Sequence, residues 1–466
     1  MAGRIEKDSL GEKEVPTDAY YGIQTARAVE NYPISGWRAH PRLIDAYMHQ
    51  KKASALANRD GGAVSAAIAG AIAQACDEVL AGRLRDQFVV DVFQAGAGVS
   101  QHMNTNEVLA NRAIEILGGR KGDYSVVHPN DHVNFGQSTN DTYPTAMRVA
   151  SLLSERDLDP VLAALEGALD AKGKQFDHVL KSGRTHLQDA VPVRLGQEFA
   201  AYARSIERCR RALRDACRQA EELGIGGTAA GTGLNTAPGY REKTIGFMRE
   251  FTRLDLRPSP DMREAMQSNL PMAAIASAQK MLALEVIRIT NDLRLMASGP
   301  ITGMAEIILP AVQPGSSIMP GKVNPAILEM AGMVGFQVAG NALAVDYAVQ
   351  AGQLELNVMM PAMTFNVLMS FEILKNALAV LRTRCIEGLQ ADEAHCKRYA
   401  ELSPSLATAL NPYIGYAKGA EVVKEALRTG RTIPEVVRDK KLLSDEELSR
   451  ILDPFKMTEP GITGKE

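Results

Sequence analysis

The sequence predicts a mainly α-helical protein built on a bundle of long helices, with smaller domains before and after it. Apolar residues recur at three- and four-residue spacing over long segments, which is the pattern of amphipathic helices. Only 11 Phe, 12 Tyr and 1 Trp occur among 466 residues, and this low aromatic content favours helix packing over sheets. Breaks rich in glycine and proline separate the periodic segments.

The length of the chain predicts more than one domain, because a single core stops growing at roughly 250 to 300 residues. We expect a mixed, mostly helical domain at residues 1–137, the long-helix bundle at 138–395, and a small helical domain at 396–466. Two capping boxes mark helix starts in the last of these, formed by Thr432 with Glu435 and by Ser444 with Glu447.

Several elements can be placed within these domains. Glycines and prolines in the first 40 residues predict loops and a small hairpin. Helical periodicity covers residues 44–58, 63–80 and 103–117, and long helices are expected within 144–222, 272–298, 325–352 and 362–388. Polar residues interrupt the apolar run at 325–352, so we interpret it as a buried bundle helix and not as a membrane span.

Charge and cysteine content exclude some classes of function. Lys and Arg number 52 against 55 Asp and Glu, without a basic stretch, so nucleic acid is not an expected partner. The five cysteines are scattered and lack metal-ligand spacing, which predicts reduced thiols of a cytoplasmic protein and no metal site. The first ten residues carry four charges, so we expect no signal peptide.

Four polar or Gly/Pro-rich breaks interrupt the helical pattern, and such loops between rigid elements often carry chemistry. They lie at residues 96–106, 137–144, 183–192 and 313–325. The last reads Gln-Pro-Gly-Ser-Ser-Ile-Met-Pro-Gly-Lys-Val-Asn-Pro. Asn324 is a candidate N-cap and Pro325 suits a first helical position, so free amides would lie beside Lys322 and form an anion site.

This thirteen-residue string resembles the signature loop of the aspartase and fumarase superfamily, whose members eliminate ammonia, water or an amine from a succinyl skeleton. The resemblance covers nearly the whole chain and leans toward the aspartases, through segments 4–8, 18–22, 104–108, 137–141, 183–190, 231–235 and 355–359. It implies the aspartase/fumarase fold and reversible, cofactor-independent deamination of L-aspartate to fumarate. It also implies a homotetramer in which three subunits contribute to each site.

The resemblance assigns roles to individual residues. Ser316 is the expected base, acting as an alkoxide that removes the proton next to the side-chain carboxylate, and His186 binds substrate or relays a proton. Ser317 would hold the side-chain carboxylate, and Lys322 with Asn324 would hold the α-carboxylate. The remaining expected substrate-binding residues are Ser100, Ser138, Thr139, Asn140 and Thr185.

Four positions depart from the aspartase pattern. Val99 replaces a threonine and His102 an asparagine, while Ile301 replaces an arginine and Met360 a glutamate. A valine cannot donate a hydrogen bond, and a lost donor to a charged group is worth about 1.5 to 3 kcal/mol. These departures keep a second hypothesis open, namely the same elimination on another substrate, such as malate or the imidazole-thione amino acid ergothioneine.

Two further interpretations come from other classes. A catalytically silent structural or binding homologue is one of them, although the intact Ser316, Lys322, Asn324 and His186 argue against it. The stretch at 224–231 half matches a dinucleotide-binding fingerprint, but it follows a helical pattern where that fingerprint requires a strand.

Overall fold

A computed structural model describes residues 3–465. The chain divides into two compact units. Unit 1 comprises the described residues up to Pro160 together with Cys209–Ala283 and Phe336–Lys375, and unit 2 comprises Val161–Arg208, Leu284–Gly335 and the described residues from Asn376 onward. Both units combine distant parts of the sequence, whereas the predicted domains at 1–137, 138–395 and 396–466 are continuous. That three-domain division remains a prediction.

Unit 1 begins with the expected hairpin, in which β1 pairs with β2 in antiparallel register from Gly3 opposite Pro16 to Asp8 opposite Gly11. Helices follow it, and Ser65 caps α3 by accepting a hydrogen bond from the amide of Ile68. These elements are β1 (Gly3–Asp8), β2 (Gly11–Pro16), α1 (Ile23–Asn31), α2 (Pro41–Asp60), α3 (Ala66–Leu80), α4 (Val99–Ile116), η2 (Pro129–Val133), β5 (Glu222–Leu223), α7 (Tyr240–Thr252), β6 (Arg257–Pro258) and α8 (Met262–Gln267).

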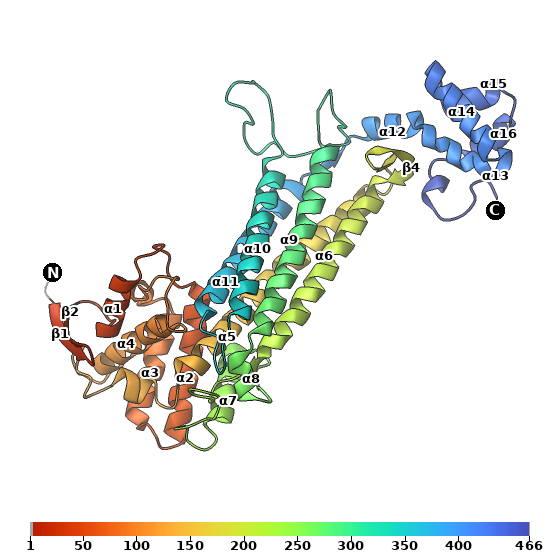
Figure 1. The fold of residues 1–466 in the computed structure, drawn as a ribbon. Coiled ribbons are helices and arrows are strands. Elements are labelled where there is room, and N and C mark those ends of the chain that lie inside the picture. The colour runs from red at the N-terminus through yellow and green to blue at the C-terminus, as the bar shows by residue number, and fades with distance from the viewer. Residues whose placement is uncertain (1–2, 466) are drawn as a thin grey trace. The chain divides into compact units, whose positions relative to one another are not determined.

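Five long helices supply residues to both units, as the periodicity predicted. They are α5 (Thr139–Gln175), α6 (Leu195–Arg218), α9 (Leu270–Met296), α10 (Ala326–Gln350) and α11 (Met360–Leu381). Within unit 2, α5, α6, α9 and α11 pack around one narrow apolar gap lined by Leu165, Ile206, Val286 and Leu381, and Figure 1 shows these helices running alongside one another.

The long helices expected within 144–222 are α5 and α6, and the break expected at 183–192 lies in a hairpin between them. β3 (Leu180–Thr185) and β4 (Gln188–Arg194) pair antiparallel between the end of α5 and the start of α6. In unit 2 this hairpin and the 313–325 loop, which precedes α10, lie at the same end of the long helices (Figure 1). Two predicted site segments therefore share one end of unit 2.

The C-terminal elements have an apolar core of their own that includes Leu410, Val422, Val436 and Ile451. Both predicted capping boxes form, since Glu435 and Glu447 accept hydrogen bonds from the backbone amides of Thr432 and Ser444. The elements are η4 (Arg382–Ile386), β7 (Ile307–Ile308) paired with β8 (Gln390–Ala391), α12 (Glu393–Leu402), η5 (Pro404–Leu410), α13 (Asn411–Ile414), α14 (Tyr416–Thr429), α15 (Ile433–Asp439), α16 (Asp445–Ile451) and η6 (Lys456–Thr458).

Helix α10 is less buried than its apolar sequence predicted. Three helical stretches, Leu270–Met296, Ala326–Gln350 and Met360–Ile386, are long and apolar enough to cross a membrane by length and composition, and only 33% of the α10 window is buried. Met333, Phe336, Leu343 and Tyr347 are each more than half exposed. Their three- and four-residue spacing puts them on one face, which is the pattern of a coiled-coil seam. In the single chain one apolar face of the 325–352 helix is therefore exposed, and the interpretation of this segment as a bundle helix in a core shared between subunits remains a prediction.

Candidate active site

The 313–325 loop is closed on itself by backbone hydrogen bonds. The amide of Gly315 donates to the carbonyl of Lys322 at 2.8 Å, and the amide of Lys322 donates to the carbonyl of Met319 at 3.3 Å. A Cβ atom at position 315 would lie 2.6 Å from the Asn324 nitrogen and 2.6 Å from the Lys322 oxygen. Glycine is therefore required there, because no side chain fits between the two arms of the loop.

Ser316 has the environment expected of an activated hydroxyl. Its Oγ is half-buried and accepts hydrogen bonds from the amides of Met319 at 2.9 Å and Ile318 at 3.2 Å. Donors that point at an oxygen favour its charged form. The backbone of the loop thus supplies two of the contacts that an alkoxide needs.

Lys322 and Asn324 lie in the same loop, but Asn324 does not behave as predicted. Its side-chain Nδ2 donates to the carbonyl of Gly315 at 2.6 Å, and α10 begins two residues later at Ala326. The prediction that Asn324 is the N-cap of the helix was therefore wrong, and its side-chain amide instead links the two arms of the loop. Ser317 and Lys322 are exposed and adjoin the Ser316 turn.

Thr185 and His186 lie at the tip of the β3–β4 hairpin. His186 and Leu187 adopt the positive φ angles of 55° and 57°, which a two-residue turn of this hand requires but which glycine or asparagine usually supplies. Both side chains are exposed. Backbone strain in non-glycine residues concentrates at functional sites, so the turn holds His186 outward at a conformational cost.

Buried charges hold the base of this hairpin. Arg184 pairs with Glu306 at 2.7 Å, and Lys181 contacts Glu306 at 3.1 Å and Glu198 at 2.9 Å. Glu306 and Lys181 are almost fully buried, where an unpaired charge is strongly unfavourable. The cluster was not predictable from sequence, because Glu306 is more than 100 residues from its partners and no local motif joins them.

Ser138, Thr139 and Asn140 form the start of α5 in unit 1. Ser138 acts as the cap, since its Oγ accepts from the amide of Asn140 at 3.2 Å. The Asn140 Nδ2 donates to the carbonyl of Ala229 at 2.8 Å, and the Thr139 Oγ1 lies 2.7 Å from the Nδ1 of His102. All three side chains are half-buried.

The glycine-rich stretch at 224–231 binds a carboxylate of the chain itself. The amides of Gly226 and Thr228 donate to Asp141 Oδ2 at 3.0 Å and 2.9 Å. Burial raises the pKa of Asp141 to about 6, and hydrogen bonds from Thr228, Ser138 and Gly226 act in the opposite direction. These amides anchor the start of α5, which leaves the dinucleotide interpretation without support.

Ser100 and Val99 lie in the first turn of α4, behind the cap residue Gly98. Val99 is 41% exposed. Ser100 lines a cavity of about 440 Å³ with Arg27, Glu107 and His128, and none of residues 138–140 lines that cavity. The structure does not join Ser100 to the start of α5.

The other two departures differ in burial. Met360 has no exposed surface, whereas Ile301 is 88% exposed. A fully buried side chain cannot contact a substrate, so Met360 does not replace a carboxylate ligand in the site. Ile301 remains available to a ligand.

The predicted site residues thus form two groups. Ser316, Ser317, Lys322, Asn324, Thr185 and His186 belong to unit 2, while Ser100, Ser138, Thr139 and Asn140 belong to unit 1. Within residues 3–465, no three His, Cys, Asp or Glu side chains come together in a metal-binding group.

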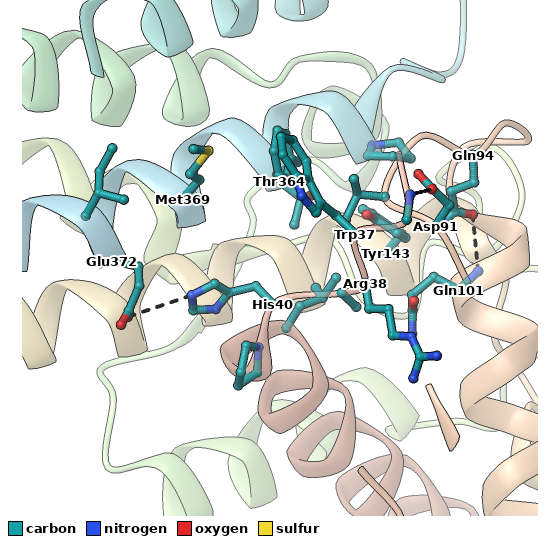
Figure 2. Close-up of a pocket in the computed structure, with 18 residues that line it drawn as sticks. Trp37, Arg38, His40, Asp91, Gln94, Gln101, Tyr143, Thr364, Met369 and Glu372 are labelled. Carbon is teal, nitrogen blue, oxygen red and sulfur yellow. Dashed lines mark hydrogen bonds and ion pairs between the residues drawn. The ribbon is translucent and has the colours of Figure 1, made fainter. Parts of the chain in front are cut away.

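A mainly apolar cavity of about 460 Å³ in unit 1 contains none of the predicted residues. Figure 2 shows its lining, in which His40 faces Glu372 at 3.9 Å, and Trp37 stacks on Phe365 with 5.2 Å between the ring centroids. Burial lowers the pKa of His40. The cavity lacks the hydroxyl and amide donors that carry the predicted chemistry.

Comparison with known proteins decides the family. A family model described as lyase matches residues 11–340, and a model of the fumarase C C-terminus matches residues 406–459. The chain belongs to this lyase family. The protein is accordingly an enzyme of the lyase class, and its aspartase and fumarase superfamily membership, expected from the loop string, is confirmed.

Relatives of this lyase include both ammonia-lyases and hydratases. It is 46% identical to an aspartate ammonia-lyase of Bacillus subtilis, over 99% of this chain and 98% of the relative. It is 49% identical to a class II fumarate hydratase of Halobacterium salinarum, over 98% of each chain. The relatives therefore share the family but differ in the group that they eliminate.

Solved structures of similar fold confirm the mainly α architecture of the lyase. A Brucella melitensis structure described as fumarate lyase:delta crystallin bound to cobalt has a TM-score of 0.96 at 46% identity, covering 98% of this chain and 100% of that one. A class II fumarase from Schistosoma mansoni has a TM-score of 0.95 at 34% identity, covering 98% and 99%.

The loop geometry predicts a specific effect of Gly315→Ala. The added Cβ would break the Gly315–Lys322 hydrogen bond, and losing about 1 kcal/mol of loop closure raises the open population about fivefold. The rate of trypsin cleavage after Lys322, measured by mass spectrometry, should rise by about the same factor of five. Gly246→Ala is the control, because a Cβ at Gly246 in α7 meets nothing within 4 Å. Equal cleavage rates in both variants would contradict the proposed loop closure.

Proposed function

We propose that this lyase catalyses reversible elimination of ammonia from L-aspartate to give fumarate, with Ser316 as the base. The observation that carries the proposal is the pair of amides, from Ile318 and Met319, that donate to the Ser316 Oγ. Ammonia-lyase relatives at 46% identity over the whole chain support the reaction.

The reaction requires removal of a weakly acidic proton from the carbon next to the side-chain carboxylate. The Ser316 alkoxide takes that proton, and the electron pair moves into the carboxylate to form a doubly charged aci-carboxylate. The pair then returns to form the carbon–carbon double bond as the carbon–nitrogen bond breaks. Ammonia leaves with the bonding electrons and takes up a proton, for which His186 is the proposed relay.

Stabilising the aci-carboxylate is the main catalytic task, because preorganised donors lower the free energy of developing charge. Ser317 supplies a hydroxyl beside the base, and Ser138, Thr139 and Asn140 supply donors at the positive end of the α5 dipole. Lys322 and the second hydrogen of the Asn324 side-chain amide hold the α-carboxylate. Thr185, which directly precedes His186, is a further substrate-binding residue. No cofactor is needed for this chemistry.

The site requires assembly, and we propose a homotetramer in which three subunits contribute to each site. The exposed seam of α10, formed by Met333, Phe336, Leu343 and Tyr347, supports association. Helix α9 exposes Leu270, Met281, Leu284 and Leu295 at heptad-compatible spacing. The five cysteines are scattered along the sequence and fit a reducing compartment, so a cytoplasmic location is proposed.

Dehydration of L-malate is the second candidate function, favoured by the 49% identity to a fumarate hydratase. Amine elimination from ergothioneine, whose quaternary nitrogen would leave as trimethylamine, is the third, motivated by Val99, which removes a donor at the carboxylate end. Initial rates of absorbance change with L-aspartate, L-malate and ergothioneine separate the three. No turnover of L-aspartate, together with turnover of another substrate, would reject the aspartate assignment.

Ser316→Ala should lower kcat for L-aspartate at least about a hundredfold, since general-base catalysis contributes roughly 10² to 10⁴. The tetramer and its affinity for succinate, a non-reacting dicarboxylate, should be unchanged. Ser317→Ala is the matched control in the same loop and should mainly raise KM. A Ser316→Ala enzyme with the wild-type kcat would show that another group is the base.

Phe336→Asp should dissociate the tetramer, because it would bury a charge in the α10 seam. Light scattering should give about the chain mass of 50.3 kDa in place of four times that mass. Leu427→Asp in α14 is the control, since Leu427 is 67% exposed and Phe336 is 65% exposed. A Phe336→Asp protein that remains tetrameric would place the interface elsewhere.

A further inference from the structure

A chain of buried polar groups lies directly behind the start of α5. The Nζ of Lys51, on α2, lies 2.7 Å from the Nε2 of His102, on α4. The Nδ1 of the same imidazole lies 2.7 Å from the Thr139 Oγ1. Lys51 has no exposed surface and His102 only 1%, and the ring of Tyr47 stacks on the imidazole at 5.9 Å. The three groups therefore hold fixed positions.

Two side-chain amides, those of Asn134 and Gln137, determine where the hydrogens of Lys51 point. The Asn134 Nδ2 donates to the carbonyl of Gln137 at 3.1 Å, and the Gln137 Nε2 donates to the carbonyl of Val133 at 3.1 Å. Their oxygens consequently face Lys51, and they accept from its Nζ at 3.0 Å and 2.9 Å. An ammonium has three hydrogens, so the third points to the Nε2 of His102.

The charge of Lys51 is balanced within the same buried region. Asp141 is fully buried, and among the described residues its carboxylate accepts hydrogen bonds from neutral donors, namely backbone amides and the Thr142 hydroxyl. Burial lowers the pKa of Lys51 well below its usual value, while Asp141 and Cys76 raise it. Because Asp141 acts against the effect of burial on Lys51, we assign the compensating positive charge to Lys51.

Burial and the neighbouring Lys51 lower the pKa of His102 well below its usual value, so the imidazole is neutral and carries one hydrogen. With Lys51 as an ammonium, Nε2 accepts its third hydrogen, and the imidazole hydrogen then lies on Nδ1 and points at Thr139. The Thr139 oxygen then acts as an acceptor toward His102. Among residues 3–465 the hydroxyl makes no other hydrogen bond, which leaves its own hydrogen free.

We propose that His102, with its tautomer set by Lys51, is a positioning residue that makes the Thr139 hydroxyl an obligate hydrogen-bond donor. A hydroxyl held in this way selects an anionic acceptor and rejects a donor such as an ammonium group. The ligand that it specifies is a carboxylate of the substrate. This inference rests on the proposed function for the identity of that substrate.

The same device explains why a histidine is compatible with the asparagine position of the aspartase pattern. Both side chains can accept on one atom and donate from another. The imidazole accepts a hydrogen bond from Lys51 on one side and donates one to Thr139 on the other, so the direction of donation along the chain of groups is kept. His102 therefore preserves the donor at Thr139 although Val99 removes a donor from the neighbouring segment.

The tautomer can be measured without any activity assay. The full-length enzyme labelled with ¹⁵N-histidine is sedimented, and its solid-state ¹⁵N spectrum is compared with that of His102→Gln to assign one of the 8 histidines. The expected signal is a protonated Nδ1 and an unprotonated Nε2. A protonated Nε2 in the wild-type enzyme would overturn the proposal.

Kinetics with L-aspartate provide the second test. His102→Leu should raise KM about ten- to a hundredfold, because a donor to a charged group is lost, with a smaller effect on kcat. His102→Gln should restore KM to within about threefold of wild type, since its amide accepts from Lys51 and donates to Thr139. Equal KM increases in both variants would indicate packing alone and overturn the proposal.

The two tests separate this inference from the proposed function. A protonated Nδ1 in an enzyme that does not turn over L-aspartate would reject the aspartate assignment and support the positioning role. A protonated Nε2 in an enzyme that turns over L-aspartate would reject the positioning role and leave the reaction intact.

Discussion

Helices α9 and α10 each carry apolar side chains on two faces, and a single chain covers only one of them. On α10 the inner face includes Leu328, Val338 and Val345, which are buried, while the Phe336 and Tyr347 side chains stay about two-thirds exposed. Burying a side chain such as Phe is worth about 1.5 to 3 kcal/mol, so a seam of this length favours association strongly. This exposed face supports the proposed tetramer, in which we propose that more than one chain completes each site.

The candidate catalytic groups are held by backbone and buried polar contacts and not by the bundle core itself. The Ser316 turn is closed by the Gly315–Lys322 hydrogen bond, and the start of α5 is anchored through Asp141 to the amides of Gly226 and Thr228. The strands that carry the tip of the β3–β4 hairpin are held by the ion pairs of Glu306 with Lys181 and Arg184. Each group is thereby fixed before substrate arrives, which is the condition for electrostatic catalysis.

Local patterns predicted much of this structure. Helical periodicity located the long helices, and the capping boxes at Thr432 and Ser444 formed as expected. The sequence predicted a break at 183–192 but not the β3–β4 strands, because they are short and lie between two strong helical segments. Periodicity showed that α10 is apolar on much of its circumference, but it did not show which face of the helix the chain itself covers.

The candidate site was predictable where its residues are contiguous and not where they are dispersed. Ser316, Lys322 and Asn324 stand in one string, although the bond from Asn324 to Gly315 depends on how the loop closes. The Lys51, His102 and Thr139 side chains come from three helices and span 88 residues of sequence, from position 51 to position 139. Their proposed role depends on which group donates and which accepts each hydrogen bond. Met360 was taken as a departure in the site because a sequence does not reveal complete burial.

Subunit complementation tests the central claim most directly, namely that assembly unites the unit 1 and unit 2 groups in one site. A Ser316→Ala chain and a chain carrying Thr139→Val with Asn140→Ala are each assayed alone with L-aspartate, then unfolded together, reassembled and assayed again. In mixed tetramers, some sites would combine Ser316 from one variant with Thr139 and Asn140 from the other, so that no substituted residue is present. The turnover of the mixture should therefore be far above the sum of the separate variants. A mixture no more active than that sum, although mixed tetramers form, would contradict the account.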